Sequence, residues 1–136
     1  QPSLKGEQCG FGVVGNLAEA MPTEAFLREI MRVTGAKVIR HSDIATPSVY
    51  RVAVCTGSGA SLIGDARKVG ADVYVTADLK YNDFYAPDSH FVVVDMGHFE
   101  SEFCAIAILF DILSKIFINF ALHKSAQSKN PVHYFV

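Results

Sequence analysis

The 136-residue sequence has few cysteines, no tryptophan and no excess of basic residues. Its three cysteines, Cys9, Cys55 and Cys104, are odd in number and never form a Cys-x-x-Cys pair, which argues against a disulfide framework and a thiolate zinc site. This usage predicts a reducing compartment, so we expect a cytoplasmic protein. Twelve Lys and Arg against 14 Asp and Glu give a net charge of −2, which provides no basic field for general nucleic-acid binding.

The start of the sequence also lacks a secretory signal peptide. Its first residues are polar, have no apolar core and do not begin with Met. We interpret residues 1–9 as a leader or linker remnant of a longer natural protein, and residues 10–136 as a single α/β domain. A chain of this length buries roughly two-thirds of its unfolded surface, which favours one compact domain over disorder.

One long apolar stretch, Phe103–Leu122, has about the length that a membrane span requires. Asp111 and Lys115 near its middle argue against a membrane and favour a buried helix over residues 99–122. Its polar side chains form only a narrow stripe, so the helix needs cover on nearly every side. It is either a central core helix, or it meets another subunit or polypeptide missing from this sequence, and the pattern favours neither.

Apolar runs separated by glycines predict alternating strands and helices. The clearest unit is a strand at 50–55, a turn at 57–59, a helix at 60–69 and a strand at 72–76, which forms a right-handed βαβ unit with parallel strands. The runs are nearly continuous in apolar residues, which predicts a layered α/β sandwich with a largely parallel sheet. Further strands are predicted at 11–14, 37–40, 91–95 and 133–136, and further helical segments at 22–34 and 79–85.

The turn at Gly57-Ser58-Gly59 imitates part of a dinucleotide-binding fingerprint, with Asp78 19 residues after Gly59. Leu62 replaces the third glycine, and its bulk would change how the helix packs on the strands, which disfavours nucleotide binding. The exposed amides of such a turn can still hold another anion.

The segment Asp95-Met96-Gly97-His98-Phe99-Glu100-Ser101-Glu102 joins a predicted strand to a predicted helix, at the sheet edge where α/β proteins place their sites. His98 and Glu102 lie one helical turn apart and can present a nitrogen and an oxygen to one metal ion. Taken alone, this common spacing favours a capping or hydrogen-bonded pair at a helix start over a ligand pair.

A second polar cluster follows the neighbouring strand. Asp78, Lys80, Asn82 and Asp83 offer two carboxylates, an ammonium and an amide within six residues. Taken alone, the cluster favours turn chemistry with an exposed ion pair. Because both clusters follow successive strands, they together define one candidate cleft.

These segments closely resemble the C-terminal half of the Nif-three-like dinuclear-metal proteins, which are often labelled homologues of the type-two GTP cyclohydrolase. Three ordered motifs at 52–63, 70–83 and 95–102 carry the resemblance, which extends to 10–17 and 130–135. It implies two interlinked α/β halves, a toroidal hexamer and two divalent transition-metal ions per subunit, with zinc, iron and manganese not distinguished. His98 and Glu102 match the family's C-terminal metal ligands, and residues 78–83 match the stretch beside the metals.

The sequence departs from the family pattern in three ways. The family's other ligands, an adjacent pair of histidines and an aspartate, belong to an N-terminal half that this sequence lacks. Ala77 replaces the usual glycine after the threonine, which tightens the approach to the cleft. Asn82 replaces the usual histidine before the second aspartate and cannot take up a proton near neutral pH.

The resemblance therefore predicts the C-terminal part of a metal-dependent, hydrolase-like protein of unsettled substrate that carries only part of the metal site. His98 and Glu102 would bind metal, and Asp78, Lys80, Asn82 and Asp83 would line the substrate pocket. The predicted partners are further copies of the chain, the missing N-terminal half and a small anionic substrate. The alternative is a non-catalytic oligomerisation or protein-interaction module of the same fold. The loss of an imidazole at Asn82 slightly favours this alternative.

Overall fold

The computed structural model describes residues 10–85 and 90–135, so the predicted leader at residues 1–9 lies outside the described residues. The described residues form a five-stranded sheet in the order β1-β3-β4-β5-β2. The three central strands run parallel, while β1 and β2 pair antiparallel at the two edges. The strand bounds are β1 Val13–Pro22, β2 Arg40–His41, β3 Ser48–Ser58, β4 Val73–Ala77 and β5 Val92–Asp95.

The predicted α/β sandwich is confirmed, and the parallel pairing holds for the central strands. The edge strands make the sheet mixed, because β1 and β2 both run against their neighbours. β1 is also longer than the predicted strand at 11–14, and β2 lies at the end of the predicted strand at 37–40. An apolar run looks the same in either chain direction, which explains why its composition does not encode parallel or antiparallel pairing.

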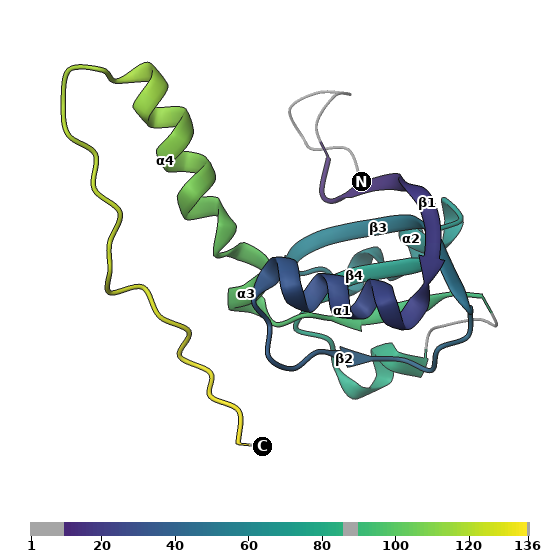
Figure 1. Ribbon diagram of the computed structural model, residues 1–136. Helices are drawn as coiled ribbons and strands as arrows, with labels where there is room; N and C mark the ends of the chain where they lie inside the picture. The colour runs from purple at the N-terminus through teal and green to yellow at the C-terminus, as the bar shows by residue number, and fades with distance from the viewer. Residues whose placement is uncertain (1–9, 86–89, 136) are drawn as a thin grey trace.

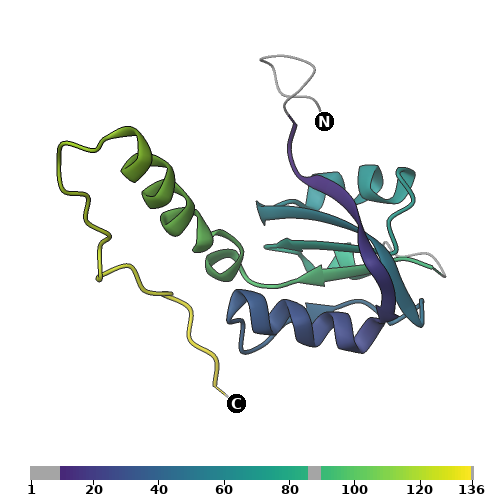
Figure 2. The same cartoon turned by 45° about the horizontal axis from the view of Figure 1, so that its top comes forward.

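Helices cover both faces of the sheet (Figures 1 and 2). Helix α1 (Thr23–Thr34) packs on one face, whereas η1 (Ala60–Leu62), α2 (Ile63–Lys68) and η2 (Tyr81–Tyr85) belong to the other side. Successive residues of β4 alternate between the two cores, since Val73 and Val75 pack with α1 and Tyr74 packs with α2. This alternation buries both faces of the central strands and makes them a rigid support for the loops at their ends.

The predicted helix at 22–34 is confirmed as α1, and its apolar spacing shows why it forms. Phe26, Leu27 and Ile30 recur at helical intervals and are buried against the sheet. The buried hydroxyl of Thr23 donates a 2.5 Å hydrogen bond to the Thr46 carbonyl at the start of the helix. Gly35 ends it in the left-handed conformation, with φ at +73°.

The predicted single helix over 99–122 is wrong in its length, and the central-core alternative for its surroundings is wrong as well. The structure instead has a short α3 (His98–Glu102) followed by α4 (Cys104–Ile116). The described residues of the predicted terminal strand, 133–135, form no strand.

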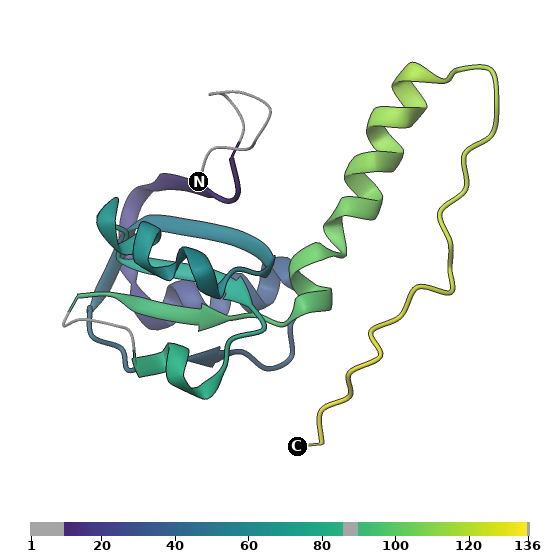
Figure 3. The same ribbon diagram turned by 180° about the vertical axis from the view of Figure 1, so that it is seen from behind.

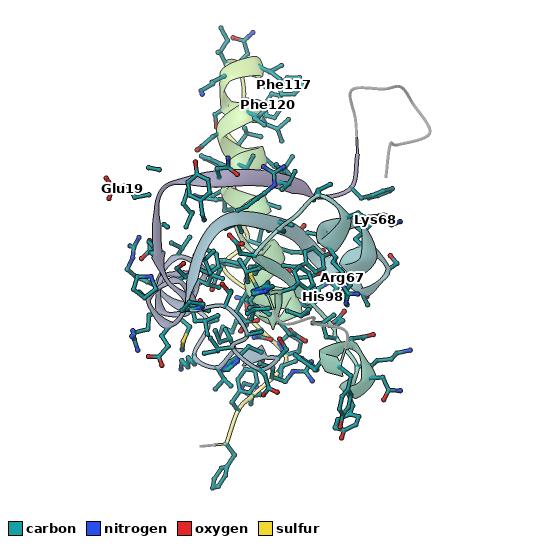
Figure 4. The ribbon with its side chains drawn as sticks, turned by 90° about the vertical axis from the view of Figure 1, so that its right-hand side faces the viewer. Glu19, Arg67, Lys68, His98, Phe117 and Phe120 are labelled. Carbon is teal, nitrogen blue, oxygen red and sulfur yellow. The ribbon has the colours of Figure 1, made fainter. Side chains whose placement is uncertain are left out.

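Helix α4 is not a core helix. It has no buried residue, and it projects away from the sheet before the remaining chain runs back beside it (Figures 1 and 3). Phe117 and Phe120 lie beyond its end, far from the sheet (Figure 4). Its exposed apolar side chains include Ile108, Leu109, Ile112 and Ile116. No helix among the described residues has the length and apolar character needed to cross a membrane.

The buried residue Tyr74 makes the stability of the fold depend on pH. Its side chain is 2% exposed and its hydroxyl donates a 2.8 Å hydrogen bond to the Gly59 carbonyl. Burial, the largest influence, raises the pKa of Tyr74 from 10 to about 12. The unfolded chain therefore releases this proton first as the pH rises, so the associated stability is present below pH 10 and is lost as the pH rises towards 12.

We expect Tyr74→Phe to lower the free energy of unfolding by about 1 kcal/mol at neutral pH, because the hydrogen bond to Gly59 is lost. The gap between wild type and variant should then narrow above pH 10, since only the wild type loses the tyrosine contribution. Urea unfolding at several pH values measures both effects, and Tyr50→Phe at an exposed position is the matched control. A gap that stays constant up to pH 12 would contradict this account.

Candidate metal centre

A glycine turn positions His98 at the carboxyl end of the sheet. Strand β5 ends at Asp95, and α3 begins at His98, one residue earlier than the predicted helix start. Gly97 between them has φ at +91°, and a Cβ atom there would lie 2.3 Å from Glu100 Oε2. Glycine is therefore required at this turn, which directs the first residue of α3 towards the end of β4.

His98 lies between two carboxylates, with different ring nitrogens facing each one. Its Nδ1 is 2.6 Å from Asp78 Oδ2, and its Nε2 is 3.2 Å from Glu102 Oε2. The hydrogen bond to Asp78 is the main cause of a raised pKa for His98, and the negative charges of Asp78 and Glu102 raise it further. The three side chains are each about half exposed, at 48–51%. Sequence reasoning predicted the His98–Glu102 pairing, but it assigned Asp78 to the substrate pocket.

Gly57 leaves space for the Glu102 carboxylate at the end of β3. A Cβ atom on Gly57 would lie 2.4 Å from Glu102 Oε1, and the residue has φ at +64°. The Gly57 amide donates to Ser101 Oγ at 2.8 Å, and its carbonyl accepts from Thr76 Oγ1 at 3.1 Å. The predicted turn at 57–59 is thus partly strand, and the Gly57 amide already has a partner rather than facing an anion.

Ser101 was missed as a site residue, although it lies within the motif at 95–102. Besides accepting from Gly57, its hydroxyl donates to the His98 carbonyl at 2.8 Å, and it is 3% exposed. It therefore fastens the first turn of α3 to β3. Its position between Glu100 and Glu102, one turn after His98, was the available signal, because a small hydroxyl there faces the sheet.

Asp78 carries an unusual backbone conformation. Its φ is +56°, in the left-handed region that non-glycine residues rarely adopt. It is the first residue after β4, between the buried residues Ala77 and Leu79. The turn aims its carboxylate at His98.

The other predicted pocket residues lie on η2, which contains Asn82 and Asp83, or directly before it, as Lys80 does. Asp83 Oδ2 accepts a 2.7 Å hydrogen bond from the Lys80 amide, which is turn chemistry, and both Lys80 and Asn82 are exposed. Across residues 10–85 and 90–135, no hydrogen bond or ion pair joins Lys80, Asn82 or Asp83 to His98. The structure thus brings Asp78 to His98 and leaves the other three on or directly before the neighbouring short helix η2.

The His98 and Glu102 pair fits one metal ion. Two ligands at ordinary zinc distances lie roughly 3.0–3.4 Å apart, and the Nε2–Oε2 separation of 3.2 Å matches that spacing. Metal-binding histidines typically donate their other N–H to a carboxylate, as Nδ1 can here to Asp78. Within the described part of the chain, no three His, Cys, Asp or Glu side chains are placed to hold an ion together. The pair can therefore provide part of a coordination shell.

An apolar pocket of about 400 Å³ borders this pair. Its walls come from α3, the start of α4 and the segment around Pro131. Asn130 ties that segment to α3 because its Nδ2 donates to Glu100 Oε1 at 2.8 Å. The cleft beside His98 is thus bounded by the C-terminal segment, which the sequence did not assign to the site.

Comparison with known proteins identifies the family. A model of the family Duf34/NIF3 (NGG1p interacting factor 3) matches residues 2–131. The chain belongs to this family. It is 34% identical over 118 residues to a Campylobacter jejuni protein named GTP cyclohydrolase 1 type 2 homolog, which covers 85% of this chain and 46% of the relative. A Clostridium perfringens protein of the same name is 31% identical over 104 residues, covering 70% and 37%.

Two crystal structures share this fold. The Staphylococcus aureus protein SA1388 superposes with a TM-score of 0.78 and 25% identity, over 93% of this chain and 42% of that chain. A Bacillus cereus protein related to NIF3 gives 0.77 and 28%, over 93% and 36%. The unmatched 7% of this chain is about ten residues, fewer than the 13 of α4, so the match includes at least part of that helix. The chain spans less than half the length of these relatives.

Two substitutions at Asp78 test both its left-handed backbone conformation and its hydrogen bond to His98. Asp78→Gly and Asp78→Ala both remove the acceptor for His98, so each should lower the pKa of His98 by a similar amount. Only glycine adopts the left-handed conformation without strain, so Asp78→Gly should be more stable than Asp78→Ala by about 1 kcal/mol. NMR titration of the His98 ring and urea unfolding measure the two effects. An unchanged His98 pKa in both variants would show that this hydrogen bond is absent in solution.

Proposed function

We propose that this chain is the C-terminal part of a dinuclear-metal, hydrolase-like protein, in which His98 and Glu102 are metal ligands. The observation that carries the proposal is the 3.2 Å approach of His98 Nε2 and Glu102 Oε2, with Nδ1 held by Asp78. Imidazole and carboxylate ligands suit zinc, iron and manganese alike. When bound, two such cations lower the pKa of a coordinated water and attract an anionic substrate.

Each side chain has a separate task in this proposal. Asp78 accepts a hydrogen bond from Nδ1–H of His98, which would leave the Nε2 lone pair free to bind an ion. Glu102 places Oε2 beside His98 and Oε1 beside Gly57, so its two oxygens face different directions. Glu102 would hold an ion through Oε2, the oxygen that faces His98 Nε2.

The remaining ligands would come from another part of a longer polypeptide. This chain provides less than half the length of its relatives, and α4 exposes the apolar side chains that such a part would cover. The pocket beside His98 is the proposed location of a small anionic substrate. Lys80, Asn82 and Asp83 keep their proposed role as substrate-pocket residues. We place this protein in the cytoplasm and propose that it assembles with further copies of itself.

Metal analysis tests the ligand assignment. In a full-length protein that contains this chain, we expect close to two transition-metal equivalents, and His98→Ala and Glu102→Gln should each remove at least one of them. His123→Ala is the matched control, because His123 is an exposed histidine beyond α4. The 136-residue chain alone should bind Zn²⁺ weakly. Unchanged metal content in both ligand variants would refute the assignment.

A second candidate function is a non-catalytic assembly module, and the exposure of α4 favours it. Ile108, Leu109, Ile112 and Ile116 are each 47–62% exposed on one 13-residue helix. Monomeric proteins seldom expose contiguous apolar surface of this kind. In this candidate function, α4 joins copies of the chain and the polar cleft catalyses no reaction.

Self-association through α4 can be measured by light scattering after size-exclusion chromatography. We expect the wild-type chain to form an oligomer, and the pair of changes Leu109→Glu and Ile112→Glu to shift it to monomer, because buried charges at a contact are costly. Val33→Glu places a charge on an exposed apolar residue of α1 and should leave the oligomer unchanged. A wild-type chain that is monomeric at every concentration contradicts the prediction.

A further inference from the structure

The last residue of β5 is a buried carboxylate with three donors. Asp95 is 4% exposed, and its Oδ1 accepts a 2.9 Å hydrogen bond from the Gly97 amide. Its Oδ2 accepts from the Leu79 amide at 3.0 Å and from Arg40 Nη2. Both oxygens therefore accept hydrogen bonds from within the protein.

The two amides belong to the two segments that meet at the candidate metal centre. Leu79 directly follows Asp78, and Gly97 directly precedes His98. The Asp95 carboxylate thus links the residue after Asp78 to the residue before His98. Because a carboxylate is planar and rigid, the hydrogen bonds at its two oxygens fix the separation of the two segments, and with it the approach of Asp78 to His98.

Arg40 completes this arrangement from the edge strand β2. Its Nη2 donates to the Leu79 carbonyl at 2.9 Å as well as to Asp95, and its guanidinium lies over the Phe84 ring, 5.3 Å from the centroid. The N–H and the C=O of Leu79 are therefore both held. A strained backbone conformation persists only where its surroundings determine it, and these contacts hold the two peptide groups of Leu79, directly after the left-handed residue Asp78.

We propose that Asp95 is a positioning residue of the metal centre and that Arg40 holds it in place. This inference rests on the proposed metal function. Asp95 acts through its neighbours: it holds the turn at Asp78 against the turn at Gly97, so that Asp78 accepts a hydrogen bond from Nδ1–H of His98 and Nε2 remains directed towards Glu102. A carboxylate with a purely structural role would stabilise the fold without affecting the tautomer of His98.

The chain provides a matched control for the substitution Asp95→Asn. Asp72 Oδ2 also accepts two backbone hydrogen bonds, from the Tyr50 amide at 2.8 Å and the Arg51 amide at 2.7 Å. It directly precedes β4, at the opposite end of the strand from Asp78. In both positions an asparagine replaces a carboxylate that accepts two backbone hydrogen bonds, so both variants should lose stability in urea unfolding. Only Asp95→Asn affects the residues next to Asp78 and His98.

The first measurement uses the metal-free chain. Long-range ¹H–¹⁵N NMR of the His98 ring, recorded above its pKa, should show the proton on Nδ1 in wild type and in Asp72→Asn. In Asp95→Asn, the population with the proton on Nε2 should rise. The same tautomer in all three proteins, or an equal change in Asp72→Asn, would overturn the proposal.

The second measurement is Zn²⁺ affinity by calorimetry. We expect Asp95→Asn to bind Zn²⁺ roughly 10-fold or more weakly than wild type, which is the scale of losses at groups that orient metal ligands, and Asp72→Asn to bind normally. Equal affinity in all three proteins would contradict the positioning role.

If wild type binds no Zn²⁺ through His98, the proposed metal function fails, while the tautomer of His98 in the metal-free chain still decides the role of Asp95. If Asp95→Asn does not fold, Arg40→Ala undergoes both measurements and should change in the same direction.

Discussion

The hydrogen bond between His98 Nδ1 and the Asp78 carboxylate is the contact on which the candidate site depends. A histidine and a glutamate one turn apart are a common surface pair on helices, and on their own they identify no chemistry. The 2.6 Å contact with Asp78 offers Nδ1–H a carboxylate acceptor, which favours the tautomer that leaves the Nε2 lone pair facing Glu102. It joins residues 20 positions apart in the chain, so only the folded sheet can create it.

Parallel strands explain how the sheet creates this contact. The carboxyl ends of β3, β4 and β5 lie at one edge, and each provides one part of the site: Gly57 makes room for Glu102, Asp78 accepts from His98, and Asp95 fastens the turns on either side. The buried valines of the two cores make this edge rigid. The order of the three central strands is therefore the physical origin of the site.

Local sequence patterns predicted much of this arrangement. Helix α1, the parallel βαβ unit and the position of both polar clusters at the sheet edge follow from apolar spacing and glycine breaks. The same reasoning grouped Lys80, Asn82 and Asp83 with Asp78, because the four are close in sequence. The left-handed turn at Asp78 separates them, and no alternation of apolar residues encodes that turn. The surroundings of α4 could not be predicted from the local sequence either, since an apolar helix does not identify the surface that covers it.

The most direct measurement of the central claim is anomalous X-ray diffraction at the zinc edge, on crystals of a full-length protein that contains this chain and has been loaded with Zn²⁺. The account predicts a peak about 2.0–2.2 Å from both His98 Nε2 and Glu102 Oε2, with Asp78 still bonded to Nδ1. Zinc bound elsewhere in the protein, with no ion between the His98 and Glu102 side chains, would contradict it.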